Sequence, residues 1–169
     1  VYEHSYAVVI GIDHYPNPRL PELAGAVRDA TNVAEALRKR GMKVTTLLDV
    51  EATKRRITEV LGEELPDRLQ RNDRVLIYFA GHGVTRGAGK RTLGYLMPVE
   101  GDSQKPVSTG ISMRELLGWL TSYESKHVMF VADACYSGLA LSSRSTGLSN
   151  RAKDYVESIS GKDVRVVLV

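Results

Sequence analysis

Short apolar runs alternate with longer amphipathic segments along most of the chain. Runs rich in β-branched and aromatic residues predict buried strands over 6–12, 43–48, 74–80, 127–133 and 164–169. Between the third and fourth of these strands we expect a glycine-rich loop over 81–89 and a short extended segment over 93–99. Strands that alternate with helices favour an α/β fold, here a three-layer α-β-α sandwich with a mostly parallel sheet.

Three segments have the spacing and end signals of helices. Apolar residues at helical spacing predict a helix over 22–40, and Gly41 closes it. A second helix is expected to start after the N-cap Thr53 and to run toward Gln70, with a break or kink before Pro66. A third helix over 112–120 starts at Ser112, and Glu115 completes a capping box.

Composition indicates one globular domain over residues 1–169. The 169 residues are 43% hydrophobic and 25% charged, and the net charge is +3. Basic residues are interleaved with acidic ones, which favours solvated helix faces over a nucleic-acid surface. No apolar stretch approaches the roughly 20 residues of a membrane-spanning helix. A single cysteine excludes an intrachain disulfide and fits a reducing compartment, so we expect a cytoplasmic protein that binds neither nucleic acid nor membrane.

The carboxyl-terminal part of the chain carries two further expectations. The Ser-rich stretch 141–163 contains Arg144, Arg151 and Lys153, and we interpret it as a mobile or processing loop. The alternative is an ordinary surface loop with solvated basic residues. The chain then stops within a core-type strand, so we expect the domain to be incomplete at its C-terminus.

Two reactive side chains follow neighbouring predicted strands. His82 comes directly after the strand 74–80, and Cys135 follows the strand 127–133. Parallel strands place their carboxyl ends at one edge of a sheet, where ligands bind. A thiol and an imidazole there form a nucleophile and an acid/base, and the backbone N–H groups of Gly83 and Cys135 are candidate oxyanion donors. The alternatives are an inert buried cysteine, or a zinc site, for which the other histidines are poorly spaced.

The residues around this pair carry a family resemblance. The segments Tyr78-Phe79-Ala80-Gly81-His82-Gly83 and Asp133-Ala134-Cys135-Tyr136-Ser137-Gly138 resemble those of caspase-like cysteine peptidases, in their metacaspase and paracaspase branch. The histidine precedes the cysteine by about 50 residues, as in caspases. The resemblance extends over nearly the whole chain and implies the caspase-haemoglobinase fold.

The resemblance also implies a substrate preference. Caspases, which cut after Asp, have Gln two residues before the nucleophile and Arg in the first helix region. This chain has Asp133 at the first place and Asp29 at the second. By resemblance, both line the primary specificity pocket, and two carboxylates favour Arg, with Lys second. The alternatives are an ion pair between Asp29 and Arg28 and a turn capped by Asp133.

The sequence therefore predicts a cysteine endopeptidase that cuts proteins or peptides after Arg or Lys, without cofactor or metal. The stretch after Gly83 lacks the acidic run that calcium would need, so we do not expect calcium activation. Further domains or a regulatory partner are expected to control activation. The alternative is a pseudo-peptidase that serves as a scaffold or interaction module. A flavodoxin-like domain is disfavoured because no phosphate-binding glycine loop follows the first strand.

Overall fold

A five-stranded parallel sheet forms the centre of the molecule. The computed structural model describes residues 2–88, 92–134, 136–137 and 164–168. The strands are paired in the order β2-β1-β3-β7-β9. Their bounds are β1 (Ser5–Gly11), β2 (Lys43–Leu48), β3 (Arg74–Ala80), β7 (His127–Asp133) and β9 (Val164–Leu168). The predicted parallel sheet is confirmed, and β2, β3 and β7 have the expected bounds.

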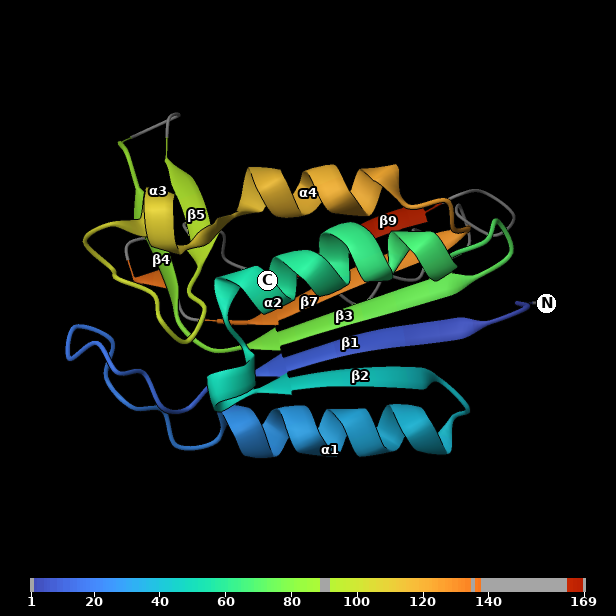
Figure 1. Ribbon diagram of the computed structural model, residues 1–169, viewed down its shortest axis with the longest axis horizontal. Helices are drawn as coiled ribbons and strands as arrows, with labels where there is room; N and C mark the ends of the chain where they lie inside the picture. The colour runs from blue at the N-terminus through green and yellow to red at the C-terminus, as the bar shows by residue number, and fades with distance from the viewer. Residues whose placement is uncertain (1, 89–91, 135, 138–163, 169) are drawn as a thin grey trace, which may run out of the picture.

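Helices cover both faces of this sheet, as the sandwich prediction requires (Figure 1). Helix α1 (Ala26–Lys39) packs on one face, and α2 (Lys54–Glu59) and α4 (Met113–Ser122) pack on the other. Strand residues alternate between the two cores: Val9 and Tyr78 face α1, whereas Val8, Ile77 and Phe130 belong to the core that includes α2 and α4. The alternation follows from the two-residue period of a strand.

A second, smaller sheet lies beyond the carboxyl ends of the central strands (Figure 1). It consists of β4 (Gly83–Arg86), β5 (Leu93–Leu96), β6 (Ile111–Ser112) and β8 (Tyr136–Ser137), and the short helix α3 (Pro106–Thr109) lies beside it. The prediction of a loop over 81–89 was wrong in part, because residues 83–86 form a strand. Antiparallel pairing with β5 satisfies its backbone and buries Val84 and Leu96 in the main core.

Helix α1 begins four residues later than the expected start at Glu22. A carboxylate from outside the helix determines its start, because Asp13 accepts hydrogen bonds from the backbone N–H groups of Gly25 at 3.1 Å and Ala26 at 2.7 Å. Gly25 itself has φ 152° and lies outside the helix. The hydrophobic pattern could not locate this cap because Asp13 is distant in sequence.

The second helical segment is divided as Pro66 suggested. Thr53 is the N-cap, and its hydroxyl accepts from the backbone N–H of Arg56 at 3.1 Å. After α2 the chain widens into a π-helical turn, Val60–Glu64, and then tightens into a 3₁₀ turn, Pro66–Arg68. Proline has no N–H and its ring crowds the preceding turn, so a regular helix cannot continue.

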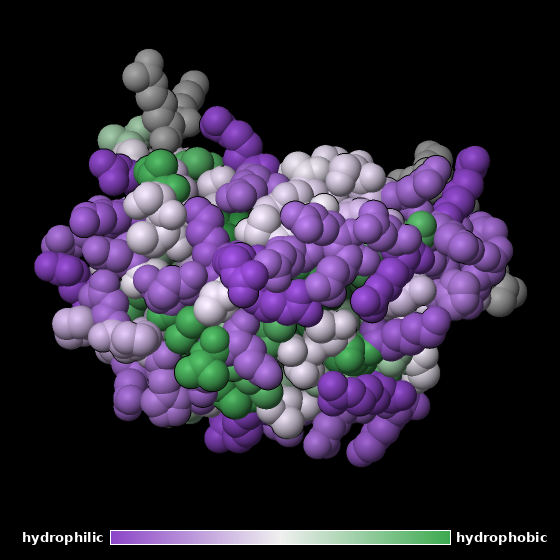
Figure 2. Space-filling model, viewed as in Figure 1, coloured by the Kyte–Doolittle hydropathy of each residue, from purple (hydrophilic) through white to green (hydrophobic). Residues whose placement is uncertain are grey.

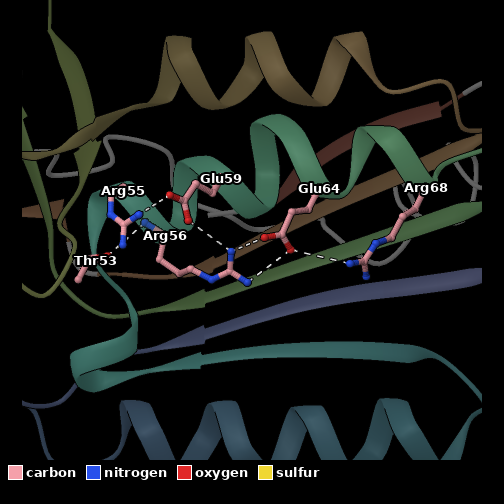
Figure 3. Close-up of polar contacts among 6 residues, drawn as sticks. All are labelled: Thr53, Arg55, Arg56, Glu59, Glu64 and Arg68. Atoms are coloured by element: carbon pink, nitrogen blue, oxygen red, sulfur yellow. Dashed lines mark hydrogen bonds and ion pairs between the residues drawn. The ribbon is translucent and has the colours of Figure 1, made fainter.

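Charged residues on the exposed side of this segment form a ladder of ion pairs (Figure 3). Arg55 pairs with Glu59 at 2.7 Å, and Arg56 contacts both Glu59 and Glu64. Ion pairs at a solvated surface add little stability. We therefore assign these charged residues to a solvated helix face and not to a functional site.

The visible surface in Figure 2 is mostly hydrophilic, and hydrophobic residues gather toward the lower left, where Figure 1 shows the amino-terminal end of α1, with smaller hydrophobic areas elsewhere. Among the described residues, no helix has the length and apolar character needed to span a membrane. The expected mobile or processing loop over 141–163 lies outside the described residues.

Close packing of α1 on β1 gives a stability prediction. A Cβ on Gly11 would lie 2.5 Å from the Cβ of Ala30 and 2.8 Å from the carbonyl oxygen of Ala26. We expect Gly11→Ala to displace α1 and lower the free energy of unfolding by about 1–3 kcal/mol. Gly118 in α4 has no neighbouring atom near its would-be Cβ. Gly118→Ala should therefore raise the free energy of unfolding by about 0.5–1 kcal/mol. Urea denaturation measures both, and changes of the same sign would contradict this packing.

Candidate active site

Pairing on both sides of the two motifs brings them to one place. Strands β3 and β7 are parallel neighbours in which Ala80 lies opposite Asp133. Beyond this point β4 and β8 pair with Gly83 opposite Tyr136. The backbone that precedes and follows His82 is thus held beside the backbone that precedes and follows Cys135. Cys135 itself lies outside the described residues.

The His82 side chain is half-buried and its ring has a defined partner. Its Nε2 is 2.6 Å from the carbonyl oxygen of Pro21. A carbonyl oxygen can only accept a hydrogen bond, so Nε2 carries the proton. In a neutral ring, Nδ1 is then the nitrogen that can accept a proton.

The loop that carries Pro21 runs between β1 and α1 and is tied down by Asp49. This residue follows β2 with a positive φ of 44°. Its Oδ1 accepts from the backbone N–H groups of Asp13 at 2.8 Å and His14 at 3.0 Å, and its Oδ2 lies 3.0 Å from Nδ1 of His14. The hydrogen bond to Asp49 raises the pKa of His14. Two backbone bonds and one side-chain bond therefore anchor the start of the loop.

The two acidic residues expected in the specificity pocket lie around one tyrosine. Tyr78 on β3 donates from its hydroxyl to Oδ2 of Asp133 at 3.5 Å. Burial raises the pKa of Tyr78, and the negative charges of Asp133 and Asp29 raise it further. Asp133 is exposed at the end of β7, and Asp29 is half-buried in the first turn of α1. Asp133 is therefore in contact with Tyr78, and the charge of Asp29 acts on the same hydroxyl from α1.

The alternative ion pair of Asp29 also exists. Nε of Arg28 lies 3.3 Å from Oδ1 of Asp29, with the arginine side chain 73% exposed. Such an exposed pair is weak, so it leaves Asp29 available to another cation.

Gly83 is buried at the start of β4, next to His82, and is paired with both β5 and β8. Its oxyanion role stays a prediction.

Sequence reasoning missed the residues that hold His82. The carbonyl of Pro21 is a backbone group, so no side-chain motif could reveal it. Tyr15, whose hydroxyl accepts from the backbone N–H of His82 at 2.9 Å, was likewise not identified. One signal was present: both residues follow β1, whose carboxyl end lies at the same edge as His82.

The histidines expected to be poorly placed for zinc are dispersed. His4 contacts Asp73, His14 contacts Asp49 and His127 contacts Tyr2. Over the part of the chain that the structure describes, no three His, Cys, Asp or Glu side chains are grouped to hold a metal ion.

Comparisons with known proteins agree with this architecture. The crystal structure of protein GSU0716 from Geobacter sulfurreducens has a TM-score of 0.67 at 20% identity, covering 80% of this chain and 52% of that chain. Caspase-1 from Spodoptera frugiperda has a TM-score of 0.60 at 18% identity, with 79% and 48% covered. The structure of pro-sf-caspase-1 has a TM-score of 0.58 at 15% identity, covering 80% of this chain and 52% of that chain. The chain thus spans about half the length of these proteins, and the likeness shows the fold.

At the sequence level, a comparison with curated proteins gave no match. The family model of the caspase domain matches residues 4–165, which include both motifs and all five central strands except the end of β9. With the sheet order and the neighbouring folds in agreement, the chain belongs to the caspase-domain family of cysteine peptidases.

Proposed function

We propose that this chain is a cysteine endopeptidase that cleaves peptide bonds after Arg or Lys, with Cys135 as nucleophile and His82 as acid/base. The observation that carries the proposal is the pairing of the two motif-bearing segments on both sides of His82 and Cys135. Only residues brought to one place can act as a nucleophile–base pair. The bond from Nε2 of His82 to Pro21 supports it, because it leaves Nδ1 as the proton acceptor.

The proposed reaction divides into an acylation of Cys135 and a hydrolysis of the resulting thioester. Nδ1 of His82 takes the proton of the Cys135 thiol, and the resulting thiolate attacks the carbonyl carbon of the scissile bond. The imidazolium then gives this proton to the departing amine as the C–N bond breaks, leaving a thioester on Cys135. Water then gives a proton to the same imidazole and attacks the thioester carbon, the C–S bond breaks to release the carboxylic acid product, and the imidazolium returns the proton to the thiolate. The carbonyl of Pro21 accepts from Nε2 throughout.

The backbone N–H groups of Gly83 and Cys135 are the proposed donors to the developing oxyanion. Gly83 is fixed in a strand that is paired on both sides, which is the rigidity that such a donor needs. A preorganised donor stabilises the tetrahedral intermediate without moving during the reaction.

Specificity is proposed to come from Asp29 and Asp133. Their joint effect on Tyr78 supports a shared negative region at the edge where β3 and β7 end. A guanidinium can form two hydrogen bonds to a carboxylate, whereas an acidic substrate side chain would be repelled. The substrates are therefore proteins or peptides with an exposed Arg, or second a Lys. The alternative function is a scaffold without catalysis, and under it we expect no turnover of any peptide.

Removing either member of the proposed pair tests the chemistry. We expect Cys135→Ala and His82→Ala each to lower kcat on a peptide with Arg before the scissile bond by on the order of 10⁴- to 10⁶-fold, because the two groups act as a unit. His127→Ala is the matched control, since this histidine lies at the opposite end of β7. Near-normal turnover by Cys135→Ala or His82→Ala would remove the assignment.

A positional peptide library tests the specificity. Asp133→Ala and Asp29→Ala should each lower kcat/KM for Arg substrates by on the order of 10- to 100-fold, because each removes hydrogen bonds to a charged group. Arg28→Ala should preserve cleavage after Arg if Asp29 serves the substrate rather than its neighbour. Asp67→Ala, at an exposed position in the 3₁₀ turn before β3, is the distant control. Efficient cleavage after Asp by the unmodified protein would contradict the proposed pocket.

A further inference from the structure

Tyr15 contacts both the backbone and the ring of His82. Its hydroxyl accepts from the backbone N–H of His82 at 2.9 Å and donates to the carbonyl oxygen of Met97 at 3.2 Å. Its ring lies beside the imidazole, with 4.8 Å between the ring centroids and 56° between the planes. Because Met97 also donates from its backbone N–H to the carbonyl of His82 at 2.9 Å, the three residues form a closed set of contacts.

The hydroxyl of Tyr15 is confined. The residue is 7% exposed, and a Cβ on the adjacent Gly81 would lie only 2.6 Å from the hydroxyl oxygen. Burial also raises the pKa of Tyr15, so the hydroxyl stays protonated and can both donate and accept. Without it, the N–H of His82 and the carbonyl of Met97 would each lose a partner in a poorly hydrated place.

Tyr15 also belongs to the loop that supplies the ring's hydrogen-bond acceptor. Pro21 lies six residues farther along the same loop, and its carbonyl accepts from Nε2 of His82. Asp49 anchors the loop at Asp13 and His14, immediately before Tyr15. A shift of Tyr15 would therefore change the position of His82 and of its acceptor together.

We propose that Tyr15 is a positioning residue that holds His82 in the Nε2–H tautomer, with Nδ1 free to act as base, through the bridge from its hydroxyl to His82 and Met97. The expected effect of Tyr15 on the rate rests on the proposed function. Its effect on the tautomer of His82 does not depend on catalysis. Tyr15 acts through His82 and not through contact with the substrate.

The first test is spectroscopic. Two-bond ¹H–¹⁵N correlation spectra of the imidazoles would be recorded in the full chain carrying Cys135→Ala, which keeps the thiol from influencing the ring. The His82 signals are identified by their loss in His82→Ala. We expect nitrogen shifts of a pure Nε2–H tautomer, and in the added Tyr15→Phe variant shifts averaged toward the Nδ1–H form. A pure Nε2–H pattern after Tyr15→Phe would overturn the inference, whatever the activity.

Tyr123 provides a matched control. It is also buried, at 2% exposed, and its hydroxyl donates to the carbonyl of Leu61 at 2.7 Å on the far side of the core. Tyr123→Phe removes the same atom and should lower the Tm comparably, yet leave the His82 spectrum unchanged. A change of the His82 tautomer in both variants would indicate general loosening and would overturn the specific role of Tyr15.

The second test is kinetic and uses the chain with Cys135 intact. Tyr15→Phe should lower kcat by roughly 10- to 100-fold with KM changed less than about twofold, because a small misplacement of the base costs rate rather than binding. Gly81→Ala should displace the same hydroxyl, so the double variant should lose little more than one substitution alone. Multiplicative losses would contradict the shared cause. If the unmodified chain cleaves no Arg or Lys peptide, the proposed function fails, while the spectra still decide the role of Tyr15.

Discussion

The parallel pairing of β3 with β7 is the constraint on which the candidate site depends. These strands are neighbours in the sheet but are separated in the chain by β4, β5, α3, β6 and α4. Their register places Ala80 opposite Asp133, and the later pairing of Gly83 with Tyr136 repeats the alignment beyond both motifs. A slip of one residue would turn every side chain of β7 to the other face and expose Phe130. The buried core therefore maintains the alignment that the proposed chemistry needs.

Orientation of His82 depends on a different set of forces. Among the described residues, its ring contacts the carbonyl of Pro21 and the ring of Tyr15, and both lie in a loop without regular structure. Asp13 and Asp49 fix the loop by accepting backbone hydrogen bonds at both of its ends. Charge-assisted bonds of this kind are stronger than neutral ones. The site thus combines strands fixed by hydrophobic burial with a loop fixed by carboxylates.

Much of the fold was predictable because each central strand is a short, nearly continuous apolar run, and the order of strands and helices then favours a parallel sheet. The start of α1 and the strand β4 were not predictable in the same way. The start of α1 depends on the hydrogen bond from Ala26 to Asp13, which is distant in sequence. The strand β4 depends on pairing with β5, and the glycines around it made the segment resemble a loop. At the site, residue type and position after a strand indicated His82, and the family resemblance indicated Asp29 and Asp133. It could not indicate Pro21, because a carbonyl is common to all residues, or Tyr15, because its role comes from tertiary contact.

The central claim is that the edge where β3 and β7 end forms a nucleophilic site that accepts a basic side chain. Peptide mapping by mass spectrometry after treatment with a chloromethylketone tests it most directly, because the reagent alkylates a nucleophile much faster when its side chain occupies the pocket. An arginyl reagent should modify Cys135 rapidly, an aspartyl reagent should react far more slowly, and His82→Ala should suppress the reaction. Absence of modification at Cys135, or equal rates with the arginyl and aspartyl reagents, would contradict the account.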